Sequence, residues 1–131
     1  MLHRVDLALR GRRRNVSSFA TGFPVLYLTA RGRRSGEPRT VPLLYLRDGD
    51  VLAVAGTNWG REHAPAWSLN LDAGPDAEVE LDGETRSVRA RRATGAEWDG
   101  YWPKLVEIWP GYASYAKRAG REIPLHVLEP R

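Results

Sequence analysis

The stretch Arg31-Gly32-Arg33-Arg34-Ser35-Gly36-Glu37-Pro38-Arg39-Thr40 decides how the chain is organised, because it separates two apolar runs, 24–30 and 41–46. Two glycines and a proline predict a turn between two strands. The turn carries four arginines within nine residues. A glycine also permits the left-handed backbone in which successive N–H groups converge on an anion. Two interpretations follow: a solvated hairpin tip that aids solubility, or an anion-binding cradle on a β scaffold.

The rest of the chain predicts an antiparallel β domain. Asp48-Gly49-Asp50 and Asp82-Gly83 are typical of tight hairpin turns. Pro42 indicates an edge strand or a bulge, because proline has no N–H for a sheet ladder. Strands joined mostly as hairpins favour an antiparallel sheet or small barrel over a parallel doubly wound sheet. About six strands are expected, over residues 25–31, 40–47, 51–55, 77–81, 85–92 and 123–128.

Two or three helices are expected to be inserted late, which makes the fold class mainly β with helices (α+β). Pro65 suits the first turn of a short helix that ends at about Leu71. Thr94-Gly95-Ala96-Glu97 predicts a capping box at the start of a second helix. Pro103 is expected to kink that helix or to begin a new one. Pro110-Gly111 predicts a break before a last helix over 112–119.

The N-terminal segment is basic. Leu2, Val5 and Leu9 share a helical spacing, which predicts a short amphipathic helix over 2–10, and four arginines follow within residues 10–14. Such a segment usually packs on its domain and continues into a solvated charge run. The alternative is weak contact with a membrane surface.

Composition narrows the classes of function. A chain of 131 residues and 14.7 kDa predicts a single domain over 1–131. The absence of cysteine excludes disulfides, thiol catalysis and cysteine-ligated metals, and fits a cytoplasmic location. A net charge of +4 and a pI near 9.8 suit an anionic ligand, a nucleic acid or an acidic membrane. His3, His63 and His126 are isolated, so no metal site is expected. Neither a Walker loop nor a nucleophile elbow is present, so an enzyme of this sequence would rely on a bound cofactor.

Aromatic residues gather in the last third of the chain. At this spacing they are usually core, but Pro110-Gly111 leaves the alternative of a lid over a flat ligand. The aromatic stripe comprises Trp98, Tyr101, Trp102, Trp109, Tyr112 and Tyr115.

Several short motifs in order resemble one family. They are Gly32-Arg33-Arg34-Ser35-Gly36-Glu37-Pro38-Arg39, Pro42-Leu43-Leu44-Tyr45, Pro65-Ala66-Trp67-Ser68-Leu69-Asn70-Leu71, Trp102-Pro103, Trp109-Pro110-Gly111-Tyr112 and Arg121-Glu122-Ile123-Pro124. From about Pro24 to Pro130 the chain resembles the deazaflavin-dependent nitroreductase family of actinobacteria. These are small split β-barrel proteins with an FMN-binding-like fold that use coenzyme F420. In two places the chain departs from the family: Thr57-Asn58-Trp59-Gly60 replaces a common Ser-Lys-Gly-Gly, and Trp109 replaces a common tyrosine.

The resemblance implies a set of site residues. The phosphate and oligoglutamate tail of the cofactor would meet Arg33, Arg34, Ser35 and Arg39. The deazaflavin ring would lie along Pro42, Leu43 and Leu44, near the backbone of Ala55, Gly56, Thr57 and Asn58, with Ala66 and Trp67 completing the wall. The substrate pocket would be bounded by Trp59, Trp109, Tyr112 and Tyr115.

The implied activity is hydride transfer from reduced F420 to a small, planar, electron-poor acceptor such as a quinone, an enone or a nitro compound. Thr57 and Tyr112 would act as hydrogen-bond donors to developing negative charge. One alternative is a non-catalytic protein that carries F420, FMN or haem. Another is an arginine-rich nucleic-acid or membrane binder, although no nucleic-acid partner is expected. The oligomeric state is expected to be a monomer or a homodimer.

Overall fold

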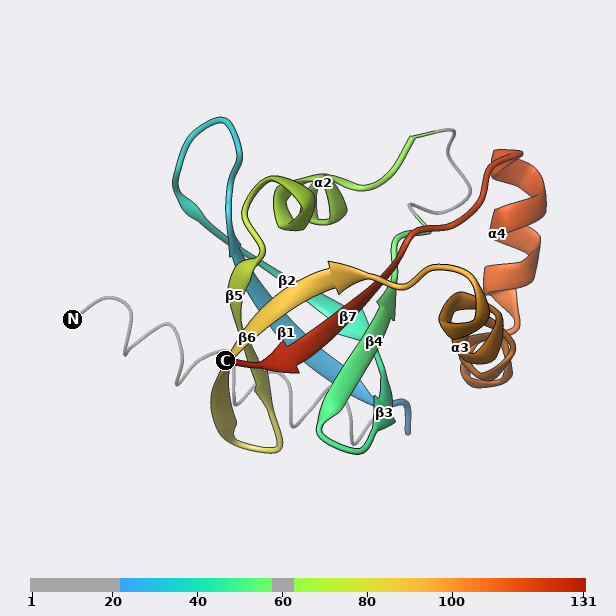
Figure 1. Ribbon diagram of the computed structural model, residues 1–131, viewed down its shortest axis with the longest axis horizontal. Coiled ribbons are helices and arrows are strands. Elements are labelled where there is room, and N and C mark those ends of the chain that lie inside the picture. The colour runs from blue at the N-terminus through green and yellow to red at the C-terminus, as the bar shows by residue number, and fades with distance from the viewer. Residues whose placement is uncertain (1–21, 58–62) are drawn as a thin grey trace.

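Seven strands form one sheet in the computed structural model, which describes residues 22–57 and 63–131 (Figure 1). Every strand pair is antiparallel, in the order β2-β1-β5-β6-β7-β4-β3. The strands are β1 (Val25–Arg31), β2 (Pro38–Leu44), β3 (Leu46–Asp48), β4 (Val51–Ala55), β5 (Asp76–Leu81), β6 (Glu84–Arg92) and β7 (Leu125–Pro130). The described helices are α2 (Ala66–Ala73), α3 (Ala96–Ile108) and α4 (Gly111–Ala119).

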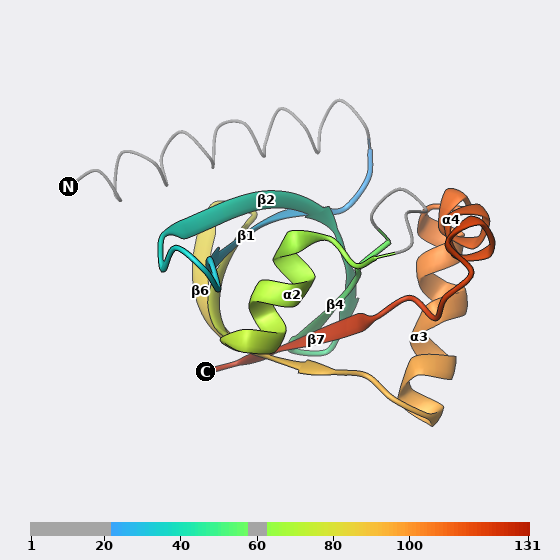
Figure 2. The same ribbon diagram turned by 90° about the horizontal axis from the view of Figure 1, so that it is seen from above.

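The sheet curls into a barrel because its two edge strands are almost continuous in sequence. β2 and β3 lie at opposite edges, and Tyr45 alone separates them. The prediction of one strand over 40–47 is therefore wrong: β2 pairs with β1, β3 pairs with β4, and Tyr45 between them donates its N–H to the carbonyl oxygen of Pro24 at 3.2 Å. Figure 2 shows the resulting ring of strands with α2 across its opening. The fold prediction, an antiparallel split β-barrel with inserted helices, is confirmed.

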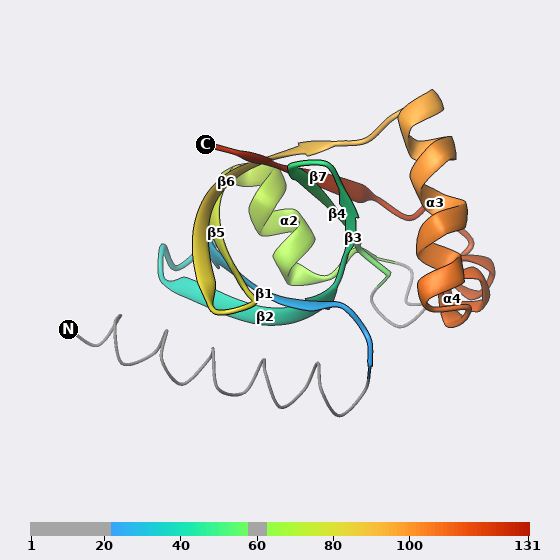
Figure 3. The ribbon, with the colours of Figure 1, turned by 90° about the horizontal axis from the view of Figure 1, so that it is seen from below.

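The strands alternate between two apolar layers. On β4, Leu52 and Val54 face the barrel interior, while Ala53 and Ala55 belong to an outer layer with α3 and α4. Leu71 of α2 joins the interior layer and closes that end of the barrel. Figure 3 shows α3 and α4 beside each other, outside the curled wall of strands. The period-two pattern of the strand thus fixes two packing surfaces at once.

The predicted turns are confirmed. Asp82 and Gly83 have φ angles of 50° and 81°, so the β5–β6 hairpin uses the left-handed conformations expected for an Asp-Gly pair. Gly49, between β3 and β4, has a φ of 63°. Pro42 lies on β2, an edge strand, as its missing N–H requires.

The start and middle of α3 differ from the sequence expectations. The predicted capping box is wrong, because the N-cap is Gly95 and no side chain caps the helix. The carboxylate of Glu97 instead binds the guanidinium of Arg91. The helix also runs without interruption through Pro103, so no new helix begins there. Both Pro103 and Asp99, whose carbonyl loses its i+4 donor, are exposed, so water can hydrate that carbonyl.

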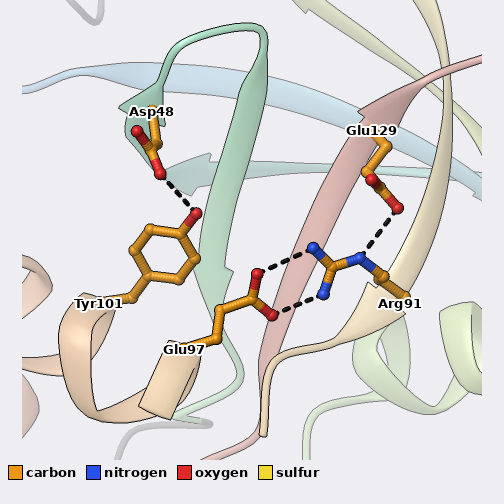
Figure 4. A network of polar contacts seen from close by, with 5 residues as sticks. All are labelled: Asp48, Arg91, Glu97, Tyr101 and Glu129. Atoms are coloured by element: carbon orange, nitrogen blue, oxygen red, sulfur yellow. Dashed lines mark hydrogen bonds and ion pairs between the residues drawn. The ribbon is translucent and has the colours of Figure 1, made fainter.

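A polar network fastens α3 to the barrel (Figure 4). Arg91 of β6 binds Glu97 with two nitrogens and donates from Nε to Glu129 of β7 at 2.9 Å. This pairing lowers the pKa of Glu97. The hydroxyl of Tyr101 donates to Asp48 at 2.7 Å, and this bond raises the pKa of Tyr101 to about 12.

The predicted N-terminal helix over 2–10 and the basic segment 10–14 lie outside the described residues, so the single domain over 1–131 stays a prediction. Within 22–57 and 63–131, no helix combines the length and apolar character needed to cross a bilayer.

Candidate active site

A cavity of about 500 Å³ opens between the edge strand β2, the end of β4, α2 and α4. Its walls are almost entirely apolar or aromatic, which is typical of a site for a flat organic ligand. The lining comprises Phe23, Val25, Val41, Pro42, Leu43, Leu44, Ala55, Thr57, Pro65, Trp67, Trp109, Tyr112 and Tyr115.

One wall is the C-terminal half of β2. Leu43 pairs with Leu26 of β1, and Leu44 pairs with Val25. Val41 and Leu43 pack against the barrel interior, whereas Leu44 packs against the layer under α3 and α4. Since β2 is an edge strand, residues on both of its faces reach the cavity.

The opposite wall is aromatic. The rings of Phe23 and Trp109 meet edge to face at 5.3 Å between centroids, and Tyr112 stacks with Trp102 at 6.3 Å. Tyr112 packs in the outer apolar layer and also lines the cavity. Within the aromatic stripe, Trp98, Tyr101 and Trp102 pack in the outer apolar layer, whereas Trp109, Tyr112 and Tyr115 pack there and also line the cavity. The lid over a flat ligand stays a prediction.

The hydroxyl of Tyr112 is the polar group of greatest chemical interest in this wall. The side chain is 7% exposed, and its hydroxyl has no hydrogen-bond partner among the residues that the structure describes. Burial raises the pKa of Tyr112 to about 12. The phenol therefore stays protonated near neutral pH and can donate a hydrogen bond to a ligand in the cavity.

Arg121 binds the backbone that follows β4, next to the cavity residue Thr57. Its Nη2 donates to the carbonyl oxygens of Gly56 and His63, both at 3.2 Å, and lies 3.4 Å from that of Thr57. Partial burial lowers the pKa of Arg121. Thr57 lines the cavity, but Gly56 does not: a Cβ there would lie 3.0 Å from Cγ of Pro124. The absence of a side chain at Gly56 is thus a packing requirement.

The basic turn lies at the other end of β2. Its backbone closes through Gly32 N to Glu37 O at 2.8 Å and Gly36 N to Gly32 O at 2.9 Å. Ser35 Oγ accepts from the N–H of Glu37 at 3.1 Å, so this hydroxyl stabilises the turn. Arg34 and Arg39 are exposed, and neither has a carboxylate partner among the described residues.

Most of the expected ring and substrate residues do meet in one place: Pro42, Leu43, Leu44, Ala55, Thr57, Trp67, Trp109, Tyr112 and Tyr115 all line the cavity. Gly56 and Ala66 do not, and Pro65 lines it in place of Ala66. Asn58 and Trp59 lie outside the described residues. Arg33, Arg34 and Ser35 lie on the turn before β2, and Arg39 is the second residue of β2; all four lie apart from the cavity lining.

Sequence reasoning missed four lining residues, which are Phe23, Val25, Val41 and Pro65. Val41 could have been found from the alternation of side chains along β2, because it lies on the same face as Leu43. Phe23 and Val25 carry no local signal, since only the pairing of β1 with β2 brings them to the cavity.

One polar pair is fully buried next to the cavity wall. Ser68 Oγ lies 2.7 Å from Nε2 of His126, and burial lowers the pKa of His126 to about 4. The ring of His126 also lies 5.5 Å from that of Trp67. Because Ser68 and His126 are 0% and 1% exposed, the pair holds α2 on β7 and does not face the cavity. The described ranges hold no group of three His, Cys, Asp or Glu side chains that could bind a metal ion.

Comparison with known proteins gives one consistent result. A family model described as F420H(2)-dependent quinone reductase matches residues 4–130. An F420H(2)-dependent quinone reductase of Mycobacterium tuberculosis is 30% identical over 116 residues, covering 82% of this chain and 74% of the relative. A solved F420-H2 dependent reductase, FDR-A, superposes with a TM-score of 0.75 at 30% identity, covering 81% of this chain and 94% of that one. A structure described as a domain-swapped dimer has the same TM-score and identity, covering 81% of this chain and 80% of that one. The chain belongs to the F420H(2)-dependent quinone reductase family.

Proposed function

We propose that this protein is an F420H2-dependent oxidoreductase that transfers a hydride from the reduced deazaflavin to a small, planar, electron-poor acceptor. A quinone is the acceptor that the family description names. The enone and nitro compounds expected from the sequence remain candidate acceptors.

One observation carries the proposal: β2 connects a basic turn to an apolar, aromatic-walled cavity. Seven residues of extended strand span about 20 Å from Pro38 to Leu44. A ligand with a flat ring at one end and an acidic tail at the other fits this arrangement, because Arg34 and Arg39 lie at one end and the cavity at the other. FMN has a shorter acidic arm, so it would use less of this surface.

The deazaflavin, when bound, supplies the hydride. The residues of the chain would bind the cofactor and the acceptor, orient them, and exclude water. Leu43 and Leu44 from β2, with Trp67 from α2, would hold the ring between apolar walls. Arg34 and Arg39 would hold the anionic tail through charge-assisted hydrogen bonds. The contributions of Arg33 and Ser35 would come mainly through the shape of the turn, since both already make hydrogen bonds to other residues of the chain.

Tyr112 and Thr57 are the proposed hydrogen-bond donors to negative charge that develops on the acceptor. Tyr112 offers a protonated phenol without a partner among the described residues, and Thr57 lines the same cavity. A donor aimed at developing charge in a dry site is worth more than the same donor in water.

Fluorescence titration with oxidised F420, beside FMN, tests the binding step, and turnover with a panel of quinones tests the reaction. We expect tighter binding of F420 than of FMN and oxidation of F420H2 when a quinone is present. Equal or reversed affinities would contradict the cofactor assignment. Tight binding of F420, FMN or haem without turnover would favour the carrier function.

A homodimer is consistent with the domain-swapped dimer among the similar structures. Monomer or homodimer, a cytoplasmic location and weak membrane contact of the N-terminal segment all remain predictions.

A further inference from the structure

Asn70 of α2 binds the basic turn at two points. Its Oδ1 accepts from the main-chain N–H of Arg33 at 3.1 Å and from Nη1 of the same residue at 3.0 Å. Asn70 is 5% exposed, and 37 residues separate the partners in sequence. An amide oxygen has two lone pairs, so this one acceptor is fully used by Arg33.

These two bonds are the external attachment of the turn. The other bonds of residues 32–37 are made within the turn and its flanks, for example from Arg31 Nη1 to the carbonyl of Gly36 at 2.8 Å. In the part of the chain that the structure describes, we find no other side chain that anchors residues 32–37 to a distant element.

The same helix forms part of the cavity wall. Trp67, three residues before Asn70, lines the cavity, and residues at this spacing lie on one side of a helix. The helix is itself fixed, because Ser68 binds His126 at 2.7 Å and Asp72 binds Arg92 at 2.7 and 2.9 Å. α2 therefore holds the cavity wall and the basic turn in a set relation.

We propose that Asn70 is a positioning residue for the acidic tail of the cofactor. It acts through Arg33: by fixing the main chain of the turn, it sets where the guanidinium group of Arg34 lies relative to Trp67 and to Arg39, which β2 holds beside the turn. The inference rests on the proposed function, since it assumes a ligand that spans the turn and the cavity.

The test compares two ligands in full-length protein: F420 and the same deazaflavin chromophore without its phosphate and glutamate tail. Asn70→Ala should weaken F420 binding by about tenfold, the amount expected from losing about one to two net hydrogen bonds. Its affinity for the tail-less chromophore should change by less than about twofold, because that ligand needs only the cavity. In steady state the KM for F420H2 should rise while kcat at saturation stays unchanged.

A variant that lacks the two arginines tests whether Asn70 acts by positioning them or by contacting the cofactor itself. In a protein that already carries Arg34→Ala and Arg39→Ala, adding Asn70→Ala should cause little further loss of F420 affinity. A full additional tenfold loss there would mean that Asn70 acts without these arginines, and would overturn the inference. Tyr101→Phe is the matched control, because Tyr101 is 9% exposed and its hydroxyl binds Asp48, so the variant loses a hydrogen bond away from α2 and the basic turn. It should lower the melting temperature without a tail-selective loss of affinity.

The remaining outcomes are also decisive. If the wild-type protein shows no preference for the tailed cofactor, the proposed function and this inference both fail. If the wild type prefers F420 and Asn70→Ala keeps that preference, only this inference fails. If Asn70→Ala loses both ligands and melting temperature together, Asn70 is a structural residue. Should the alanine variant not fold, Asn70→Leu, which fills the same space without an acceptor, replaces it.

Discussion

Replacing Tyr112 by phenylalanine removes one hydroxyl from the cavity wall and leaves the ring. The ring packs in the outer apolar layer and stacks with Trp102, so packing is preserved. The hydroxyl has no partner in the described part of the chain, so its loss leaves no buried group unpaired. We therefore expect the free energy of unfolding to change by less than about 0.5 kcal/mol.

The kinetic effect should be much larger. A hydroxyl that donates to developing negative charge in a dry site contributes about 3–4 kcal/mol, so its removal should slow turnover by about a hundredfold or more. Because burial raises the pKa of Tyr112 to about 12, the wild-type phenol stays protonated from pH 6 to 9. Ionisation of Tyr112 should therefore cause no loss of rate in that range.

Tyr101→Phe is the matched control. Tyr101 is 9% exposed, close to the 7% of Tyr112, but its hydroxyl donates to Asp48 at 2.7 Å away from the cavity. Losing this charge-assisted bond should cost about 1.5 kcal/mol and lower the melting temperature by several degrees, with F420H2 oxidation unchanged.

Thermal unfolding and single-turnover oxidation of F420H2 with a quinone, measured on both variants, decide between the roles. The reasoning is refuted if Tyr112→Phe loses stability and keeps its rate. That result would make the Tyr112 wall a packing surface only.

Three further predictions follow from the same geometry. Replacing Arg34 and Arg39 together by alanine should weaken F420 binding by about 2–4 kcal/mol and reduce its salt dependence, measured by titration at several ionic strengths. The pKa of His126 falls from 6.5 to about 4 on folding, so the unfolded state takes up a proton first as the pH drops. The free energy of unfolding should therefore be constant above pH 6.5 and fall by up to about 3 kcal/mol as the pH drops toward 4. The charges of Asp72 and Arg92 act on the pKa of His126 in opposite directions, so burial dominates the shift. In chemical denaturation, the free energy of unfolding of His126→Gln should vary less between these pH values than that of the wild type. Gly56→Ala should destabilise the fold by about 1–3 kcal/mol, since its Cβ would press on Pro124; an unchanged melting temperature would show that the site relaxes freely.

Much of the fold could be predicted because its signals are local. The Asp-Gly turn at Asp82 needs positive φ angles that few residue pairs adopt, and the alternation of β4 specifies two buried faces. The positive charge of the basic turn and the apolar character of the C-terminal half of β2 could also be predicted, since each is a property of a contiguous stretch of sequence. Each of these features depends on residues adjacent in the sequence, which set the local backbone conformation, polarity and charge.

Other features could not be predicted from the sequence, because they depend on contacts made only in the closed barrel. The division of 40–47 into two strands at Tyr45 has no local signal, because it arises only where the chain changes its pairing partner from β1 to β4. Glu97 fits a capping box by sequence, yet it binds Arg91 because a bidentate guanidinium competes better than one backbone N–H.

Local sequence was enough to predict most of the strands, the hairpin turns, the positive charge of the central turn and the apolar character of β2. The partner of each polar group and the distant side chains that complete the cavity could be read only from the folded barrel. Phe23 reaches Trp109, and Asn70 reaches Arg33, through chain closure that no local pattern encodes. Adjacent residues largely set the backbone conformation, whereas the partner of a hydrogen-bond acceptor or of an apolar face is whichever group the whole fold brings nearest.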